Sequence, residues 1–429
     1  MTFQEKLNIL IDDMAKPPDS LGLLEKQARQ VFTAWGCFDK KFNPKHIIFG
    51  ADNGIVRAGV VSQIADITYM QCRHMEEGTS AVTCFCQVNA VPWEVVDVGI
   101  DSADAVGIDR KIARGTKNFM IEPAMTETEL KKAFSIGQER VMAAKAAGYN
   151  FLSFGEMGIG NTTTSAAVLT AIAPRHSTFL TGYGSAKGNF KLLLHKRRII
   201  RDALHRYAPY IHSAADALRY VGGFDLAALC GAMMACAEAH IPFYIDGFIT
   251  AVALACAIQL QPPVQSYALP SHLSREPGMC AALHLCGIDE YDVPIHADMC
   301  LGEGTGAVLG VVLLRSMLYA VWHMSTLSGI TREAEHHQKY GTVQDTPIVV
   351  NQSEMNGLIN PERTTMDETL RKQAVTIFEN MGLTEEEAVT LFYKRTIAAG
   401  RMPFGPAEPK KEHPKKKRMN ERMAEWDAF

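Results

Sequence analysis

The feature that most constrains this chain is a short apolar run that passes into a glycine-containing loop and then into an alanine-rich helix. It extends from Phe151 to Thr164, with Gly155, Gly158 and Gly160 in the loop. A short apolar run of this kind is typical of a buried strand of a parallel sheet. Backbone N–H groups at a helix start, together with the hydroxyl side chains that open the helix, suit an anion. The segment therefore predicts an α/β protein with a ligand beyond the carboxyl end of this strand.

Two well-known nucleotide-binding fingerprints do not fit this loop. No Gly-Lys-Ser/Thr follows it, as a Walker A loop requires, and Gly158-Ile159-Gly160 lacks the third glycine of the dinucleotide fingerprint. A buried helix with a simple cap would need the threonines of the loop but not Glu156. Glu156 is therefore a candidate functional carboxylate.

The same strand-to-loop pattern recurs elsewhere in the chain. His46 to Gly50 runs into Asp52-Asn53-Gly54, and Trp93 to Gly99 follows at a spacing that fits a β-α-β unit. Later, Pro242 to Ile245 leads into Asp246-Gly247-Phe248. Because the carboxyl ends of parallel strands meet at one edge of a sheet, these loops are expected to lie close together.

A second carboxylate, Glu303, stands between glycines at the head of the apolar segment Ala307–Trp322. Only Arg315 and Ser316 interrupt that segment, which predicts a buried helix, since it is slightly short for a membrane span. The start of such a helix carries free N–H groups and a positive dipole end, which suit an anionic ligand. The alternative is a glycine-rich turn with a solvated glutamate. Two glycine-flanked glutamates in one chain favour a shared site.

Composition narrows the function classes further. The chain has 429 residues, 47% of them hydrophobic, and a formal net charge of -4, which gives no indication of nucleic-acid binding. The polar stretch Met1–Lys16 lacks the apolar core of a signal peptide, so we expect a soluble cytoplasmic protein whose ten cysteines are free thiols in the core. Cys84-Phe85-Cys86 lacks the usual spacing of a zinc site, so no metal is expected.

Four motifs occur in the order seen in one enzyme family. They are Lys16-Pro17-Pro18-x-Ser20-Leu21-Gly22, Gly155-Glu156-Met157-Gly158-Ile159-Gly160-Asn161-Thr162-Thr163, Ser271-His272-x-Ser274-x-Glu276-x-Gly278 and Leu301-Gly302-Glu303-Gly304-Thr305-Gly306. With them, the chain resembles the nicotinate-nucleotide:dimethylbenzimidazole phosphoribosyltransferases, which activate the lower-ligand base of cobalamin. The resemblance covers roughly residues 5–330.

The resemblance implies a Rossmann-like α/β fold, with a mostly parallel sheet flanked by helices and a smaller helical domain built from terminal segments. Residues 1–40 are then the N-terminal helical part of the small domain, and residues 41–330 are the phosphoribosyltransferase domain, whose late helices are candidates to join the small domain. It also implies a homodimer in which the subunits contribute to each other's sites.

The C-terminal region lies outside the resemblance. Residues 331–402 are expected to form a partly helical extension, in which Thr365–Met381 and Thr384–Ala399 read as an amphipathic helical pair. Residues 403–429 are expected to be a basic, flexible tail. A more specific hypothesis is that this tail makes an electrostatic contact with an acidic partner or a membrane surface.

The resemblance also assigns roles to individual residues. Glu303 matches the general base of the family, and Glu156 matches its second carboxylate. The residues expected around the nucleotide and its phosphate are Gly158, Gly160, Asn161, Thr162, Lys196, Ser274, Gly302 and Gly304. Gln71 and Gln63 match positions in or near the base pocket. No cofactor is implied. From its composition alone, the basic turn Arg114–Lys117 is a further candidate phosphate contact.

The implied reaction moves the 5-phosphoribosyl group from nicotinate mononucleotide to 5,6-dimethylbenzimidazole or a related base in cobamide biosynthesis. The pyridinium leaves as a neutral ring and needs no acid, whereas the attacking base must lose a ring proton, which Glu303 would accept. Attack from the opposite face of the sugar would convert the β-nucleotide into an α-ribotide.

The chain departs from the family pattern at two positions. Asp52-Asn53-Gly54 stands where many members have Asp-His-Gly, and Gly182-Tyr183-Gly184-Ser185 replaces Gly-x-Gly-Thr-Gly. Two alternatives therefore stay open beside the enzyme. One is a supporting subunit of a heteromeric base-activating enzyme, and the other is a non-catalytic nucleotide-binding module with the same fold. The preferred base also stays open.

Overall fold

The computed structural model describes residues 1–61, 66–173, 180–184, 188–340, 368–380, 384–385 and 387–390. The chain divides into two compact units, Met1–Gly341 and Thr342–Phe429. The expected boundary at residue 40 falls inside the first unit and stays a prediction.

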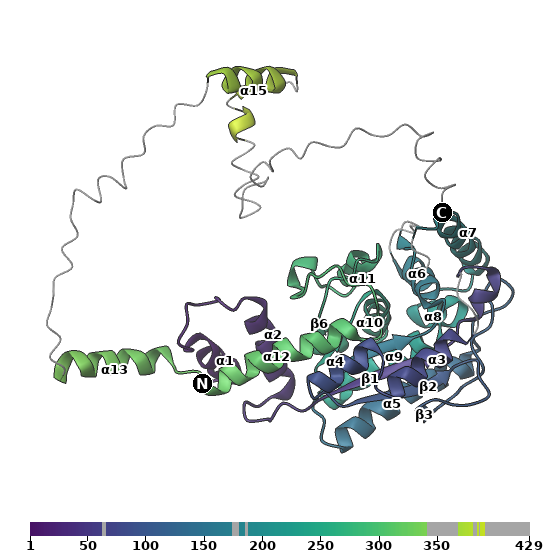
Figure 1. Ribbon diagram of the computed structural model, residues 1–429, viewed down its shortest axis with the longest axis horizontal. Coiled ribbons are helices and arrows are strands. Elements are labelled where there is room, and N and C mark those ends of the chain that lie inside the picture. The colour runs from purple at the N-terminus through teal and green to yellow at the C-terminus, as the bar shows by residue number, and fades with distance from the viewer. Residues whose placement is uncertain are drawn as a thin grey trace, which may run out of the picture. The chain divides into compact units, whose positions relative to one another are not determined.

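A six-stranded sheet forms the centre of the first unit (Figure 1). Its strands are β1 Pro44–Ala51, β2 Trp93–Gly99, β3 Ile108–Asp109, β4 Phe151–Met157, β5 Phe243–Ile245 and β6 Ala268–Pro270. They lie in the order β3-β2-β1-β4-β5-β6, and all neighbouring pairs are parallel. This is the Rossmann strand order, whose direction reverses between β1 and β4, where ligands usually bind. The predicted Rossmann-like α/β fold is confirmed.

The central strand β1 shows why the sequence forms a sheet covered on both faces. Ile47, Ile48 and Phe49 have no exposed surface, as expected for a strand that is an almost continuous apolar run. Ile47 and Phe49 belong to the core on one face, and Ile48 belongs to the core on the other. β1 pairs with β4 in a register that places His46 opposite Ser153.

One face of the sheet is covered by helices from the middle of the chain. They are α5 Glu127–Ala146, α6 Asn161–Ile172, α7 Phe190–Tyr207, α8 Ala214–Val221, α9 Phe224–Ala239, α10 Phe248–Leu260 and α11 Met279–Leu285. The predicted N-cap of α5 is confirmed. The Thr126 hydroxyl accepts from the Glu129 N–H at 3.2 Å, and the Glu129 carboxylate accepts from the Thr126 N–H at 2.7 Å. These reciprocal bonds form a capping box.

The other face is covered by helices from both ends of the first unit. They are α1 Phe3–Asp12, α2 Leu23–Trp35, α3 Ile67–Glu76, α4 Ala81–Val88 and α12 Thr305–His323. Although they are far apart in sequence, α2 and α12 lie in contact. By length and composition α12 could cross a membrane, but 56% of its apolar window is buried inside the protein. The prediction of a buried helix after Glu303 is confirmed.

Six of the ten cysteines are buried as free thiols, as predicted for small core side chains, whereas Cys84 is exposed. Several elements were not predicted, among them the strands β3 and β6 and the helices α8, α11 and α13 (Leu327–Tyr340). β3 and β6 have two and three residues, which is too short for a periodic pattern, and α13 lies in a polar stretch.

The second unit contains α15, Glu368–Asn380, which lies within the predicted helix Thr365–Met381. In the predicted second helix, Glu385 and residues 387–390 are helical, and Thr384 and Glu387 form a capping box at its start. The predicted basic tail, residues 403–429, lies outside the described residues.

Candidate active site

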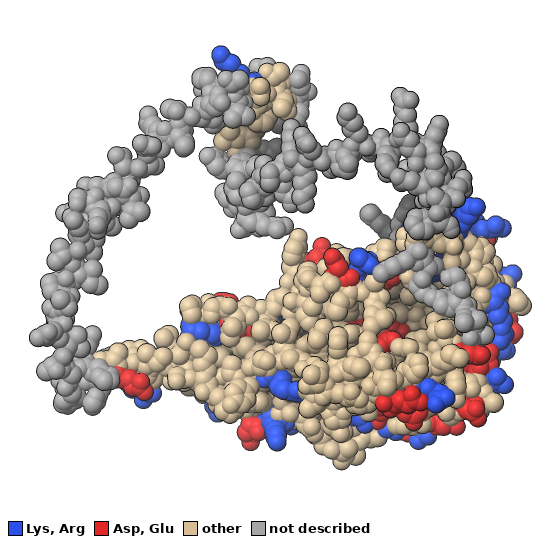
Figure 2. Space-filling model, in the orientation of Figure 1, with Lys and Arg blue, Asp and Glu red and all other residues tan. Residues whose placement is uncertain are grey.

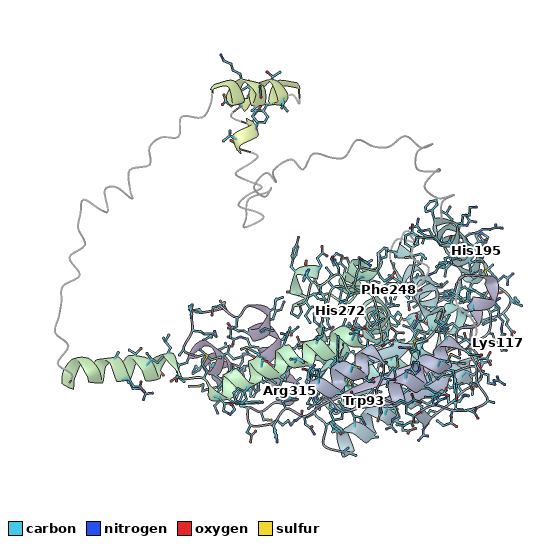
Figure 3. The ribbon with its side chains drawn as sticks, viewed as in Figure 1. Trp93, Lys117, His195, Phe248, His272 and Arg315 are labelled. Carbon is cyan, nitrogen blue, oxygen red and sulfur yellow. The ribbon has the colours of Figure 1, made fainter. Side chains whose placement is uncertain are left out.

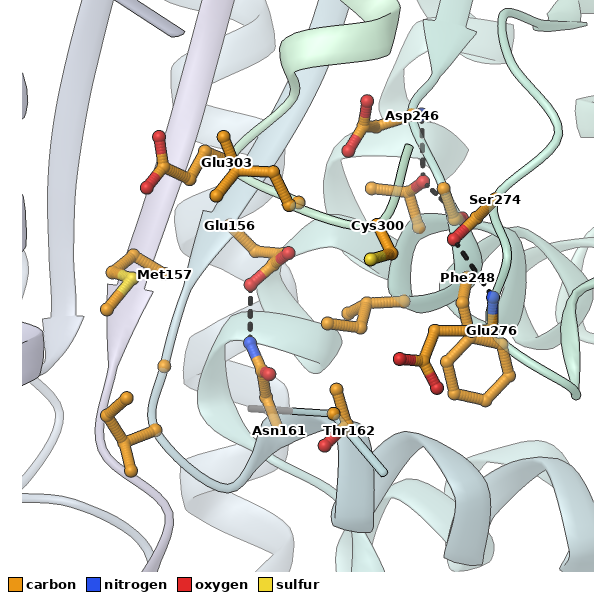
Figure 4. Close-up of a pocket in the computed structure, with 18 of the residues that line it drawn as sticks. Glu156, Met157, Asn161, Thr162, Asp246, Phe248, Ser274, Glu276, Cys300 and Glu303 are labelled. Carbon is orange, nitrogen blue, oxygen red and sulfur yellow. Dashed lines mark hydrogen bonds between the residues drawn. The ribbon is translucent and has the colours of Figure 1, made fainter. Parts of the chain in front are cut away.

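A pocket with a volume of about 710 Å³ opens beyond the carboxyl ends of β4, β5 and β6 (Figure 4). Its lining includes both glycine-flanked glutamates, Glu156 and Glu303, and most of the other expected site residues: Gln71, Gly158, Gly160, Asn161, Thr162, Ser274 and Gly302. Asp246 also lines it. Figure 3 shows His272 and Phe248, which also line the pocket, close to each other at this edge of the sheet. The pocket therefore lies where the strand-to-loop pattern predicts a ligand.

Glu156 lies near the end of β4 and is almost fully buried. The amide nitrogen of Asn161 donates to the Glu156 carboxylate, as Figure 4 shows, and also to Asp225 Oδ2 at 3.2 Å. Burial raises the pKa of Glu156 well above its usual range, and the nearby carboxylates of Asp225 and Asp246 raise it further. The surroundings thus favour the neutral form of Glu156 more than water would.

Glu303 lines the pocket, and one oxygen of its carboxylate is held by a neighbouring side chain. Oε1 accepts a hydrogen bond from the Gln71 amide at 2.7 Å, whereas Oε2 is buried and has no such side-chain partner among the described residues. Burial raises the pKa of Glu303, and the bond from Gln71 and the nearby backbone of Val82 partly oppose that shift. A buried carboxylate with a raised pKa at the wall of a pocket is suited to accept a proton.

The backbone at Glu303 has an uncommon conformation. Gly302, Glu303 and Gly304 have φ angles of 84°, 65° and 92°, all in the left-handed region. Glycine adopts such angles readily, whereas a glutamate does so only when its surroundings hold it there. A Cβ added at Gly302 would lie 2.7 Å from Glu156 Oε1, so the two glutamates meet at this turn. Gly302 lines the pocket, but Gly304 faces the interior beside His46.

The start of α12 is occupied by a side chain of the protein itself. Asp246 Oδ1 accepts from the N–H groups of Gly306 at 2.7 Å and Ala307 at 3.1 Å, and Oδ2 accepts from the Gly304 N–H at 3.3 Å. The expectation that this helix start would hold an anionic ligand is therefore wrong. Asp246 follows β5 directly, and the order of the strands brings it to α12.

The loop between β4 and α6 supplies a continuous part of the pocket lining, in which the backbone can approach a ligand. Gly158, Gly160, Asn161 and Thr162 all line the pocket, and Ser274 lies across from them in Figure 4. Gly160 has a φ angle of 90°, which turns the chain into α6. The grouping of these residues agrees with the sequence expectation for a phosphate site.

Lys196 reaches the same region from α7 without lining the pocket. Its ammonium donates to Thr162 Oγ1 at 3.2 Å and to the carbonyl oxygens of Gly182 and Tyr183 at 3.3 and 3.4 Å. The side chain is 1% exposed, and this burial lowers the pKa of Lys196 to about 8. The charge of Lys196 can therefore act on an anion held beside Thr162.

The structure tests only part of two further expectations, the base pocket and the basic turn. Gln71 lies in the pocket against Glu303, whereas Gln63 lies outside the described residues. In the basic turn, Lys117 pairs with Glu122 at 3.0 Å and does not line the pocket, and Figure 3 shows it well away from His272. The cation of Lys117 is therefore not a phosphate contact in this structure.

Asn53, which replaces the common histidine, is buried beside the loop. Its amide nitrogen lies 3.4 Å from the carbonyl oxygen of Ile159. A Cβ added at Gly223 would lie 2.5 Å from Asn53 Oδ1 and 2.4 Å from Asp225 Oδ1, so these two oxygens lie close together. Burial raises the pKa of Asp225 to about 6. At the position where the resemblance implies a histidine, this chain thus has a neutral amide beside a carboxylate.

Sequence reasoning gave no role to three buried polar residues around the site. They are His46, Asp225 and His272, each less than 3% exposed. For Asp225 the signal was an ionisable residue inside an apolar run, which rarely occurs without a partner or a function, whereas His272 lies in a polar motif that gives no such signal. Among the described residues, no group of three or more His, Cys, Asp or Glu side chains could hold a metal ion.

Comparison with known proteins identifies the family. The family model described as phosphoribosyltransferase (DBI_PRT) matches residues 1–330. The chain belongs to this phosphoribosyltransferase family. A nicotinate-nucleotide–dimethylbenzimidazole phosphoribosyltransferase of Clostridium perfringens is 38% identical over 299 residues, which are 69% of this chain and 82% of that protein. A protein of the same name from Ruminiclostridium cellulolyticum is 36% identical over 343 residues, which are 76% of this chain and 96% of that protein.

A solved structure supports the same conclusion. The crystal structure of CobT from Thermus thermophilus is 30% identical and has a TM-score of 0.72, covering 77% of this chain and 98% of that one. A second family model, RelB antitoxin, matches residues 361–424. The family members therefore share the first unit, and the second unit is similar to a different family.

Proposed function

We propose that this chain is a nicotinate-nucleotide–dimethylbenzimidazole phosphoribosyltransferase. It moves the 5-phosphoribosyl group of nicotinate mononucleotide to 5,6-dimethylbenzimidazole or a related base, and gives nicotinate and the α-ribotide for cobamide biosynthesis. The observation that carries the proposal is one pocket that contains both glycine-flanked glutamates of the family motifs. The presence of Glu303 in that pocket favours the enzyme over the two non-catalytic alternatives.

We assign the role of general base to Glu303. The attacking base forms a bond from one ring nitrogen to C1′ of the ribose, and its other ring nitrogen must lose a proton. The Glu303 carboxylate, which lines the pocket, would accept that proton, while Gln71 holds Oε1. The departing pyridine is neutral, since its nitrogen is cationic in the substrate, so one carboxylate supports the proton transfer that the reaction needs.

We assign Glu156 and the loop from Gly158 to Thr162 to the nucleotide. Glu156 lies beside the turn that carries Glu303, where the ribose would lie between phosphate and base. Lys196 and Ser274 would hold the phosphate with the loop. Fixing the phosphate at one end of the pocket would place C1′ near the base at the other, which lowers the entropic cost of the reaction.

We further propose that the enzyme is a cytoplasmic homodimer. The outward face of α12 supports this proposal, because Leu309, Val312 and Leu313 are only partly buried and Tyr319 is 61% exposed. Figure 2 shows a largely uncharged surface along α12. Partly exposed apolar side chains grouped on one helix often mark an interface. Sedimentation should report a dimer, which Tyr319→Lys should weaken.

We infer a second, separate role for the C-terminal unit, namely binding to another protein. The match to RelB antitoxin over residues 361–424 favours it. None of the described side chains of α15, which are residues 372–378, is buried, and Ile377 is 58% exposed. An isolated helix of this length is only marginally stable in water, so a partner would stabilise it.

The enzymatic proposal can be tested directly. Purified full-length protein is incubated with nicotinate mononucleotide and each of a panel of benzimidazole, purine and phenolic bases, and the α-ribotide is separated by chromatography. We expect release of nicotinate in equal amount with at least one base. Binding of nicotinate mononucleotide without release of nicotinate would favour the non-catalytic module. Activity only after a similar chain is added would favour the supporting subunit.

A further inference from the structure

One buried polar group beside the site has no part in the chemistry described so far. His46 lies in β1 and has no exposed surface. Its Nε2 is 3.2 Å from the backbone carbonyl oxygen of Glu303, and its Nδ1 is 2.8 Å from Ser153 Oγ. Ser153 is the residue paired with His46 across β1 and β4. The imidazole thus joins the centre of the sheet to the turn that carries Glu303.

The partners of His46 determine where its proton lies. A carbonyl oxygen only accepts hydrogen bonds, so Nε2 must carry the hydrogen and donate it to Glu303. Nδ1 of the neutral ring then accepts from the Ser153 hydroxyl. Burial lowers the pKa of His46 to about 4, in agreement with a neutral ring. With both nitrogens bonded, the ring has one tautomer and one orientation.

Two glycines make room for this contact. A Cβ added at Gly304 would lie 2.1 Å from His46 Cε1, and a Cβ added at Gly155 would lie 2.0 Å from the Glu303 carbonyl oxygen. Real Cβ atoms do not approach other atoms so closely. The glycines of both glutamate motifs therefore serve the packing of imidazole and turn as well as any ligand.

We propose that His46 and Ser153 form a positioning pair that holds the catalytic carboxylate of Glu303 in place. The turn has three anchors: His46 holds the carbonyl of Glu303, Asp246 accepts from the next N–H group, and Gln71 holds the carboxylate. Without the first anchor, a buried carbonyl loses its donor, and the left-handed conformation at Glu303 loses the contact that holds it. The inference rests on the proposed role of Glu303 as the base.

The first test is His46→Phe, which keeps a ring but removes the donor. We expect kcat to fall roughly 10- to 100-fold, because a misplaced catalytic group costs about that much. KM for nicotinate mononucleotide should stay within about twofold, since the expected phosphate contacts are on other elements. The matched control is Trp322→Phe, which removes the 2.8 Å bond from the indole to Phe38 at the other end of α12. It should leave kcat unchanged.

Milder variants separate positioning from folding. Ser153→Ala should leave the ring in place but free both tautomers, so kcat should fall less than in His46→Phe. His46→Gln can still present an N–H group to the carbonyl and should recover part of the lost rate. If His46→Phe does not fold, the expected fall of kcat below the wild-type value in Ser153→Ala and His46→Gln still tests the inference. Equal, wild-type kcat in both variants would overturn it.

A double-mutant cycle gives the sharpest readout. If His46 acts through Glu303, then Glu303→Gln combined with Ser153→Ala or His46→Phe should be no slower than Glu303→Gln alone. Losses that multiply would show that His46 acts independently of Glu303 and would overturn the proposal. A wild-type protein that forms no α-ribotide would instead contradict the proposed enzyme, so the two failures are distinguishable.

Discussion

At the scale of single residues, the site is an unusual collection of buried carboxyl groups. Glu156, Asp225, Asp246 and Glu303 all have raised pKa values, with burial as the largest cause. Clusters of titratable groups with shifted pKa values are found mainly at functional sites. Of the four, Glu303 combines pocket exposure with a carboxylate oxygen that has no side-chain partner among the described residues.

Replacement of Glu303 by glutamine tests the base directly. Glutamine keeps the size of the side chain but does not accept the proton, so we expect turnover to fall roughly 10²- to 10⁴-fold. Single-turnover formation of the α-ribotide measures this change. The control is Glu122→Gln, at the surface ion pair with Lys117, which should have no effect. Wild-type rates in Glu303→Gln would remove Glu303 from its role.

The acid side of the pH profile should report the same residue. The pKa of Glu303 is raised above 4.5 by burial, and the base must be deprotonated to act. We therefore expect kcat/KM to decline as the pH falls, with a midpoint above 4.5. This limb should vanish in Glu303→Gln, and its persistence there would assign it to another carboxyl group.

The alkaline side of the pH profile should report the titration of Lys196. Its pKa is lowered to about 8, whereas an unfolded lysine has a value of 10.5. Between these values the unfolded chain binds more protons, so this group makes the folded protein more stable as the pH rises from 8 to 10.5. Phosphate binding needs the charged form, so kcat/KM should fall above about pH 8. Lys196→Arg does not titrate there and should move the limb to higher pH.

At the scale of elements, α12 joins the base to the fold, because its first turn is capped by Asp246 from the end of β5. The carboxylate accepts three N–H groups around the turn of Glu303. This arrangement satisfies the donors at the helix start and fixes its position relative to the sheet. Because Asp246 occupies these N–H groups, the phosphate of the proposed substrate is expected to bind elsewhere in the pocket.

Removal of this cap should affect both stability and turnover. Asp246→Ala leaves buried N–H groups unsatisfied, and we expect a loss of about 1–3 kcal/mol in unfolding free energy together with slower turnover. Thr126→Ala, which removes the cap of α5 on the surface, should cost about 1 kcal/mol and leave turnover unchanged. Urea unfolding and ribotide assays of both variants make the comparison. Equal turnover in the two variants would contradict the positioning of Glu303 through α12.

At the scale of the whole molecule, the site and the C-terminal unit are built from different parts of the chain. Every described residue that lines the pocket lies between residues 67 and 303, inside the first compact unit. The match to a second family begins at residue 361, in the second unit. Catalysis and partner binding are therefore expected to be separable.

Removal of residues 342–429 tests this separation. We expect unchanged kcat and KM for nicotinate mononucleotide, because no described pocket residue is removed. Proteins that bind through the second unit should be captured by the full chain and lost from the shortened one. Loss of turnover in a folded, shortened protein would show that the second unit contributes to the site.

The amino-acid sequence alone determined the fold class, most long helices, four strands of the sheet and the two glutamate motifs. These features depend on local patterns, such as the apolar run of β1 and the glycines around Glu156 and Glu303, which persist in any context. Thr126 could be recognised as a cap for the same reason. Short elements such as β3 and β6 have too few residues for a pattern and form because neighbouring strands supply their hydrogen bonds.

Only the tertiary structure decided what holds the base in place. His46 and Glu303 are 257 positions apart, and Asp246 lies 60 positions before the Gly306 N–H group that it caps. No local pattern links such residues, because their contact depends on the parallel order of the strands and on the path of α12. The sequence thus pointed to Glu303 as the candidate base, and the packing of β1, β4 and α12 determined its backbone conformation and its raised pKa.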